Sequence, residues 1–117
     1  MVSVLTPEEI ARIATEAAAE KQAVDVMLLD VRESCSFADF FVVCTGDSER
    51  QIVAIWEEIV DMLRMHDVQV LHKEGAGSGW LLADYGSVVV HVFAPEERAY
   101  YQIESLWKDA IPVLRIQ

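Results

Sequence analysis

Basic residues are scarce in this chain, whose 117 residues include 9 Lys and Arg against 20 Asp and Glu, a formal net charge of −11 at pH 7. Phosphate backbones repel such a surface, which argues against nucleic acid as the primary partner. A basic protein surface would suit it, because opposite potentials speed encounter and fix register. The alternative reading is that the acidic charge only keeps the protein soluble.

Long hydrophobic runs are also missing. The longest apolar stretches, such as Phe40 to Cys44, are far too short to cross a bilayer. Met1 to Glu9 has neither the basic start nor the apolar segment of a signal peptide. We therefore expect a cytoplasmic protein with no membrane contact. Hydrophobic residues make up 53% of the chain, which excludes a disordered chain, and its length suits one domain over residues 1–117.

Cysteine and histidine are few and widely spaced. Cys35 and Cys44 fall outside any CxxC spacing, which favours two free thiols in a reducing compartment. His66, His72 and His91 show no ligand-like spacing. We therefore predict no metal and no cofactor. Since His91 alternates with valines, we interpret it as a hydrogen-bonded structural or surface histidine on one sheet face.

Hydrophobic periodicity and capping patterns predict an α/β protein with a mixed sheet of about five strands flanked by helices. Two capping boxes, Thr6-Pro7-Glu8-Glu9 and Ser48-Glu49-Arg50-Gln51, mark helix starts. The apolar run from Phe40 to Cys44 is typical of a central strand covered on both faces. We expect Ile111 to Gln117 to be a tail. The predicted elements are a helix from 7 to about 21, strands at 24–31 and 40–44, a helix from 48 to about 66, a strand at 68–71, a two-stranded hairpin at 80–93, a short helix from 95, and a helical turn or two at Ile103, Leu106 and Trp107.

The most informative segment runs from Gly79 to Gly86, with the sequence GWLLADYG, and continues into a β-branched run ending at Phe93. An apolar run, a tight polar turn and a second apolar run predict a β-hairpin. Trp and Tyr are the residues most enriched at protein–protein hot spots, so the hairpin is a candidate docking edge. Packing of Trp80 into the core remains the alternative, whereas Trp56 and Trp107 are readily explained as core residues.

Three other segments invite a chemical reading. The loop 75–79 is rich in glycine, but no P-loop lysine and no helix follow it, which favours a mobile connector. The segment 45–48 precedes a helix and could bind an anion, but its own acids favour capping. Ser36 could act as a nucleophile with His91 and Asp84, although nothing in the sequence brings the three together.

Two blocks together resemble the ribosomal silencing factor family (RsfS, also called Iojap). The resemblance covers roughly residues 7 to 110. The matching segments, in order, are Leu29-Asp30-Val31, Ser36 to Gly46, Ser48 with Arg50-Gln51, Glu74-Gly75, Gly79 to Gly86, Val88 to Phe93, Arg98, Tyr100-Tyr101 and Leu106-Trp107.

The resemblance implies a binding protein and not an enzyme. Family members attach to the large ribosomal subunit through its fourteenth protein, here called L-fourteen, at the face that meets the small subunit. They prevent the subunits from joining and so repress translation when nutrients are scarce. Organellar relatives assist assembly of the large subunit, which is the first alternative.

A less favoured alternative is an enzyme, because the family fold is similar to that of nucleotidyltransferases. Those enzymes need neighbouring carboxylates to hold catalytic metal. Asp25 and Asp30 are five residues apart, which predicts that they point to opposite faces of a strand, and the sequence has no D-x-D. The resemblance therefore implies the fold without the activity.

The hairpin supplies the predicted contact residues for the ribosomal partner. We expect Trp80 to fill an apolar depression and Asp84 to pair with Lys or Arg. The same surface could pair two copies of the chain as a homodimer, which would compete with ribosome binding. The predicted partner-binding residues are Trp80, Leu82, Asp84, Tyr85, Tyr100 and Tyr101.

Overall fold

Side-chain caps fix where the first helix begins. The computed structural model describes residues 5–103 and 110–116. Helix α1, Pro7–Glu20, starts at Thr6, whose hydroxyl accepts a hydrogen bond from the Glu9 backbone N–H at 3.2 Å. The Glu9 carboxylate accepts in return from the Thr6 N–H at 2.8 Å. The predicted capping box is therefore confirmed.

The second helix, α2, Glu49–Arg64, begins with a modified version of the same device. The Ser48 hydroxyl accepts from the Gln51 N–H at 3.1 Å, as predicted. The Gln51 side chain, however, accepts from the backbone N–H of Asp47, one residue before the cap. The backbone N–H groups of Asp47 and Gln51 are thus paired with side chains of the same segment.

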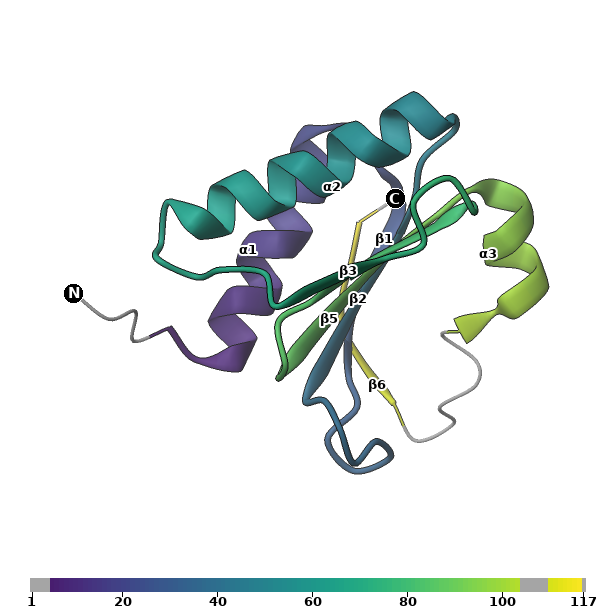
Figure 1. The fold of residues 1–117 in the computed structure, drawn as a ribbon. Helices are drawn as coiled ribbons and strands as arrows, with labels where there is room; N and C mark the ends of the chain where they lie inside the picture. The colour runs from purple at the N-terminus through teal and green to yellow at the C-terminus, as the bar shows by residue number, and fades with distance from the viewer. Residues whose placement is uncertain (1–4, 104–109, 117) are drawn as a thin grey trace.

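The strands form one mixed sheet, as predicted for an α/β fold. Their order across the sheet is β3-β4-β5-β2-β1-β6, with β2 and β5 parallel and the other neighbours antiparallel (Figure 1). The strands are β1 Val24–Asp30, β2 Phe40–Thr45, β3 His72–Glu74, β4 Trp80–Asp84, β5 Val88–Phe93 and β6 Ile111–Ile116.

Two strand predictions were wrong. The segment from residue 111 is not a tail but strand β6, which pairs antiparallel with β1 and gives the described sheet a sixth strand. Its burial alternates only weakly and it contains Pro112, so its sequence shows little strand periodicity. The third strand lies at 72–74, after the predicted 68–71, because β4 supplies a pairing partner there. Both are edge strands that tertiary pairing selects.

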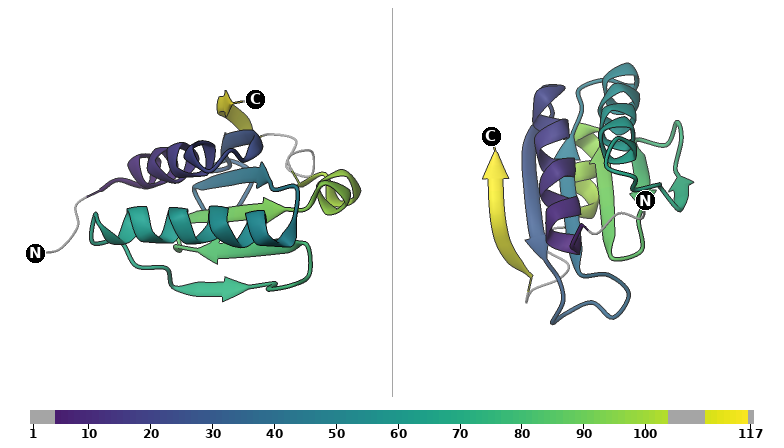
Figure 2. Two further views of the ribbon diagram at one scale, coloured as in Figure 1. Left: turned by 90° about the horizontal axis from the view of Figure 1, so that it is seen from above. Right: turned by 90° about the vertical axis from the view of Figure 1, so that its left-hand side faces the viewer.

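The sheet has two different faces. Helices α1 and α2 lie side by side across one of them, here called the helix face (Figures 1 and 2). Ile52, Ile55, Ile59 and Leu63 of α2 are buried there. Strand β2 is buried along its whole length, which confirms the prediction of a central strand. The helix face therefore holds the larger part of the core.

The opposite face, here called the aromatic face, is covered differently. Its buried residues include Phe41, Val89 and Phe93, and Trp80 and Leu82 pack against them. The short helix α3, Pro95–Tyr101, follows β5 and lies at the end of the sheet where β4 and β1 begin (Figure 2). The predicted turns at Leu106 and Trp107 lie outside the described residues.

Within the described part of the chain, no helix has the length and apolar character that crossing a membrane requires.

Candidate protein-binding face

Strand β4 presents its side chains to the two faces alternately. Leu81 and Ala83 are buried with the helix-face core, whereas Trp80 and Leu82 pack against the aromatic-face cluster. Asp84 continues the second series, since successive residues of a strand point to opposite sides. Three of the predicted contact residues are thus brought together on one face.

Trp80 is held by contacts from two elements. Its indole N–H donates a hydrogen bond to Nδ1 of His91 on β5, at 3.1 Å. Its ring stacks on Phe93, with centroids 4.9 Å apart, and lies 4.7 Å from the ring of Tyr101 on α3. The side chain remains only partly buried. Trp80 is therefore packed against the core but keeps part of its surface exposed, and its docking role stays a prediction.

His91 is the polar support of this aromatic cluster. Its ring is 4% exposed, and burial lowers the pKa of the imidazole to about 3, so the ring is neutral at physiological pH. An indole nitrogen can only donate, so Nδ1 of His91 accepts and its proton sits on Nε2. Among the described residues Nε2 has no partner. The predicted structural role is confirmed, and such a ring cannot serve as a general base at neutral pH.

An open pocket of about 400 Å³, here called the sheet-face pocket, lies on this face. Its walls are mostly apolar, and two carboxylates stand among its lining side chains. The lining residues are Phe37, Phe41, Glu74, Trp80, Leu82, Asp84, Gly86, Val89, His91 and Ile103.

The acidic side chains of the pocket are fixed by local contacts. Asp84 accepts a hydrogen bond from the Gly86 N–H at 2.7 Å, which shapes the turn between β4 and β5. Gly86 has a φ of 86°, a conformation that favours glycine. Glu74 lies opposite Leu82 on β3 and contacts His72 Nε2 at 3.0 Å. The pocket therefore combines apolar lining side chains with two carboxylates.

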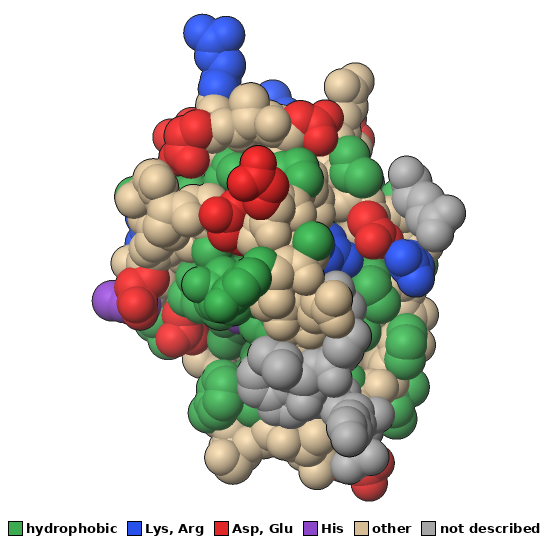
Figure 3. All heavy atoms as spheres, turned by 90° about the vertical axis from the view of Figure 1, so that its right-hand side faces the viewer, with side chains coloured by type: hydrophobic (Ala, Val, Ile, Leu, Met, Phe, Trp, Pro, Cys, Tyr) green, Lys and Arg blue, Asp and Glu red, His purple; other side chains and the backbone are tan. Residues whose placement is uncertain are grey.

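The predicted tyrosines occupy three different environments. Tyr85 is 8% exposed and packs with the helix-face core, so it is not brought together with Trp80. Burial raises the pKa of its phenol to about 12. Tyr100 is 82% exposed and Tyr101 42%, and their rings meet edge to face at 5.0 Å. Figure 3 shows hydrophobic side chains gathered on this side with acidic ones around them.

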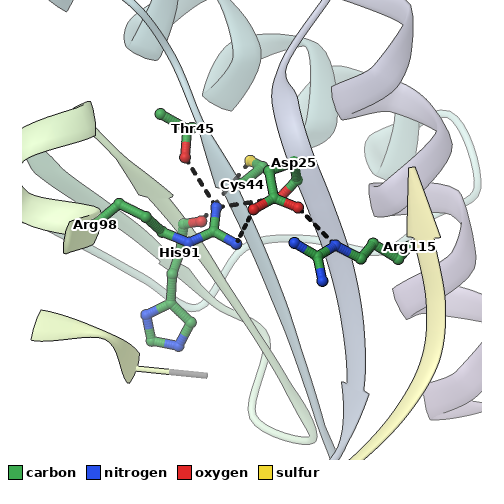
Figure 4. Close-up of polar contacts among 6 residues, drawn as sticks. All are labelled: Asp25, Cys44, Thr45, His91, Arg98 and Arg115. Carbon is green, nitrogen blue, oxygen red and sulfur yellow. Dashed lines mark hydrogen bonds and ion pairs between the residues drawn. The ribbon is translucent and has the colours of Figure 1, made fainter. Parts of the chain in front are cut away.

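Arg98 anchors α3 and hence Tyr101. Its guanidinium donates to the Thr45 hydroxyl at 2.8 Å and to the backbone carbonyl of Asp25 at 3.1 Å (Figure 4). The Asp25 carboxylate accepts from Arg98 at 3.4 Å and from Arg115 of β6 at 2.8 Å. Asp25 has a φ of 51° at an irregularity in β1. One carboxylate thus ties β1, α3 and β6 together.

Neither cysteine is suited to chemistry. Cys44 of β2 is fully buried in the helix-face core, with its thiol 3.8 Å from the carbonyl oxygen of His91 (Figure 4). Burial raises the pKa of this thiol to about 12, so it stays protonated. Cys35 is also buried and free, although the sequence placed it in a polar loop that could be exposed.

The remaining chemical readings find structural explanations. The 75–79 loop is the turn between β3 and β4, where the Ser78 hydroxyl donates to the Gly75 carbonyl at 2.7 Å. At the start of α2 the Ser48 hydroxyl accepts from the Gln51 N–H and the Gln51 side chain accepts from the Asp47 N–H, which confirms the capping reading. In residues 5–103 and 110–116 no cluster of three or more His, Cys, Asp or Glu side chains could hold a metal ion.

The sequence analysis did not predict three residues of the aromatic face as contact residues. Phe37 is 65% exposed and lies 6.2 Å from Phe41, in a loop that looked merely polar. Glu74 was read only as part of a motif, and His91 only as a structural residue. The strand register Leu82↔His91 places His91 on the same face as the hairpin residues. The alternation of side chains along the strands could therefore have placed His91 on this face. The same alternation puts Tyr85 on the face opposite Trp80.

Comparison with known proteins gives the same family from sequence and from structure. The family model described as "RsfS: Ribosomal silencing factor during starvation" matches residues 4–117. A protein of Bacillus subtilis named ribosomal silencing factor RsfS is 41% identical over 107 residues, which are 91% of each chain. A crystal structure of a Chromobacterium violaceum protein superposes with a TM-score of 0.85 at 34% identity, covering 97% of this chain and 95% of that one.

A more distant relative carries a different name. A mouse protein named mitochondrial assembly of ribosomal large subunit protein 1 is 32% identical over 92 residues, which are 75% of this chain and 40% of the mouse protein.

Proposed function

Since this chain belongs to the ribosomal silencing factor family, we propose that it binds the large ribosomal subunit through ribosomal protein L-fourteen and blocks joining to the small subunit. Translation is thereby repressed when nutrients are limiting. The place of action in this proposal is the cytoplasm, and the partner surface is protein, not nucleic acid.

The aromatic face carries this proposal. Trp80 and Leu82 offer partly exposed apolar surface in the sheet-face pocket, and the exposed Tyr101 lies against Trp80. Glu74 and Asp84 also line the pocket. Aromatic anchors in the middle of a polar rim are the usual arrangement of a protein-binding hot spot. A net charge of −11 favours a basic protein as the partner and disfavours direct contact with rRNA.

The carboxylates of β1 are engaged in ion pairs, which disfavours an enzymatic role for them. Asp25 is engaged by Arg98 and Arg115, and Asp30 by Arg32 at 2.7 Å. The Arg32 hydrogen bond lowers the pKa of Asp30 below its usual value. Carboxylates paired with arginines at opposite ends of a strand are poorly placed to share a catalytic metal. We therefore propose a non-enzymatic protein.

Assembly of the large subunit is the second candidate function. The mouse relative is named for that role, and a factor that occupies the subunit interface could serve both purposes. The two functions differ in time: an assembly factor binds immature particles, whereas a silencing factor binds mature ones.

Co-sedimentation with purified mature subunits tests the proposal. We expect the protein to pellet with large subunits only and to prevent formation of joined ribosomes when small subunits are added. Binding to immature large particles alone would favour assembly. Binding to neither mature nor immature subunits would overturn both candidates.

A further inference from the structure

His91 presents a buried hydrogen-bond donor for which residues 5–103 and 110–116 supply no acceptor. Its Nδ1 accepts from the Trp80 indole, so the neutral ring carries its proton on Nε2. No described atom accepts a hydrogen bond from Nε2. Buried polar groups in folded proteins are almost always paired, so an orphan of this kind calls for an explanation.

In the described part of the chain, the groups around His91 supply no acceptor. The Phe41 ring meets the imidazole edge to face at 4.8 Å, and the Phe93 ring lies nearly parallel to it at 6.2 Å. The two carboxylates of the sheet-face pocket contact other groups, Asp84 the Gly86 N–H and Glu74 His72, and neither accepts from Nε2. His91 itself lines that pocket, so the acceptor can arrive through it.

We propose that the sheet-face pocket takes an apolar side chain from a basic polypeptide segment, and that a backbone carbonyl of that segment accepts a hydrogen bond from His91 Nε2–H. The inference rests on the proposed function and names the chemistry by which the face recognises its protein partner. His91 thereby becomes a specificity-determining residue and not only a support for Trp80.

The two carboxylates that line the pocket determine which chemical group can enter it. Glu74 and Asp84 repel a phosphate or a carboxylate that approaches the pocket, so a neutral carbonyl is the acceptor that fits. The same acids attract Lys or Arg side chains on either side of the inserted residue. The walls formed by Trp80, Leu82 and Phe37 match an aliphatic or aromatic side chain.

The pocket must adjust for the contact to form, because the His91 ring is only 4% exposed. Phe37 lines the pocket and is 65% exposed, so its side chain has room to rotate. Rotamer changes of this size are common when interfaces form. In this proposal the complex supplies the acceptor that the described residues lack.

Two substitutions separate the roles of the two ring nitrogens. In His91→Asn the amide oxygen replaces Nδ1 as acceptor for Trp80, and nothing replaces Nε2. In His91→Gln the longer amide places a donor near the Nε2 position and leaves Trp80 without its acceptor. The Trp80 indole N–H resonance and thermal unfolding report whether each variant keeps the fold and the Trp80 contact.

We expect His91→Asn to bind purified large subunits about tenfold more weakly than the wild type, with the Trp80 resonance retained. His91→Gln should retain more of the binding than His91→Asn. Binding by His91→Asn at wild-type strength would overturn the inference and leave the proposed function standing. Failure of the wild type to bind would overturn both.

A measurement on the unaltered protein avoids any dependence on mutant folding. In protein labelled with ¹⁵N-histidine, the His91 Nε2–H proton should move downfield when purified L-fourteen binds, as a new hydrogen bond requires. An unchanged resonance in a formed complex would overturn the inference. Binding to rRNA stripped of protein, with none to L-fourteen, would overturn the polypeptide occupant.

Discussion

Trp80 and His91 face each other diagonally across strands β4 and β5, and the indole N–H of the first donates to Nδ1 of the second at 3.1 Å. The contact fixes the tryptophan ring from a neighbouring strand, while Phe93 and Tyr101 pack against it. A large aromatic anchor held in one orientation loses little conformational entropy when it binds. Trp80 is therefore held in one orientation, as the proposed contact role requires.

Replacing Trp80 by Ala should weaken binding to the large subunit by about 30-fold or more, the loss typical of a hot-spot residue. Binding is measured by co-sedimentation at several subunit concentrations. Trp80→Phe, which keeps an aromatic ring but not the N–H, should bind between the wild type and Trp80→Ala. Circular dichroism checks that both variants fold. If Trp80→Ala and Asp84→Arg, tested as separate variants, both bind as strongly as the wild type, the proposed interface is wrong.

Asp84→Asn should slow association with the large subunit several-fold without disturbing the hairpin. The asparagine oxygen still accepts from the Gly86 N–H, so the substitution removes the charge and leaves the turn intact. The association rate is followed by stopped-flow at low and high salt. A difference from wild type that persists unchanged at high salt would contradict an electrostatic role.

The buried neutral His91 should make the protein less stable in mild acid. Its pKa is about 3 in the folded protein and near 6.5 when unfolded, so the unfolded state binds the proton between these values. Stability from this group is therefore complete above pH 6.5 and is lost as pH falls toward 3. Between pH 6.5 and pH 5 the loss should be about 2 kcal/mol.

Urea denaturation at both pH values measures this loss, and His91→Asn is the matched control. The variant has no imidazole, so its stability should fall less over the same interval. An identical pH dependence in the two proteins would show that other groups are responsible.

Asp25→Asn should destabilise the fold by about 2 kcal/mol, because the ion pair that Asp25 makes with the buried Arg98 is lost. Asparagine tolerates the left-handed backbone at this position, so the substitution tests the charge alone. Arg115→Ala should cost less than about 1 kcal/mol, since Arg115 is half exposed. Thermal unfolding of the two variants decides; a larger effect of Arg115→Ala would reverse the assignment of the anchor.

Self-association through the aromatic face remains a prediction. If two copies pair there, Trp80→Ala should raise the monomer fraction, and dimerisation of the wild type should compete with ribosome binding. Light scattering of both proteins over a range of concentrations measures the monomer fraction. Equal fractions would place any dimer contact elsewhere.

Local sequence determined most of the elements. The capping residues Thr6 and Ser48 marked the helix starts, because their side chains satisfy N–H groups only a few residues away. The continuous apolar run of β2 and the turn at Gly86 identified the central strand and the hairpin. The family blocks added the α/β fold and the ribosomal connection, which the comparisons support.

Tertiary structure alone decided the edges of the sheet and the composition of the proposed binding face. Strand β6 exists because β1 offers an open edge for pairing, a long-range contact that no local periodicity reports. The Trp80–His91 hydrogen bond and the Arg98–Asp25 pair likewise join elements far apart in sequence. Strand parity could have assigned Tyr85 to the helix face, but the orphan Nε2 of His91 depends on the atoms packed around it, and only the fold brings those together.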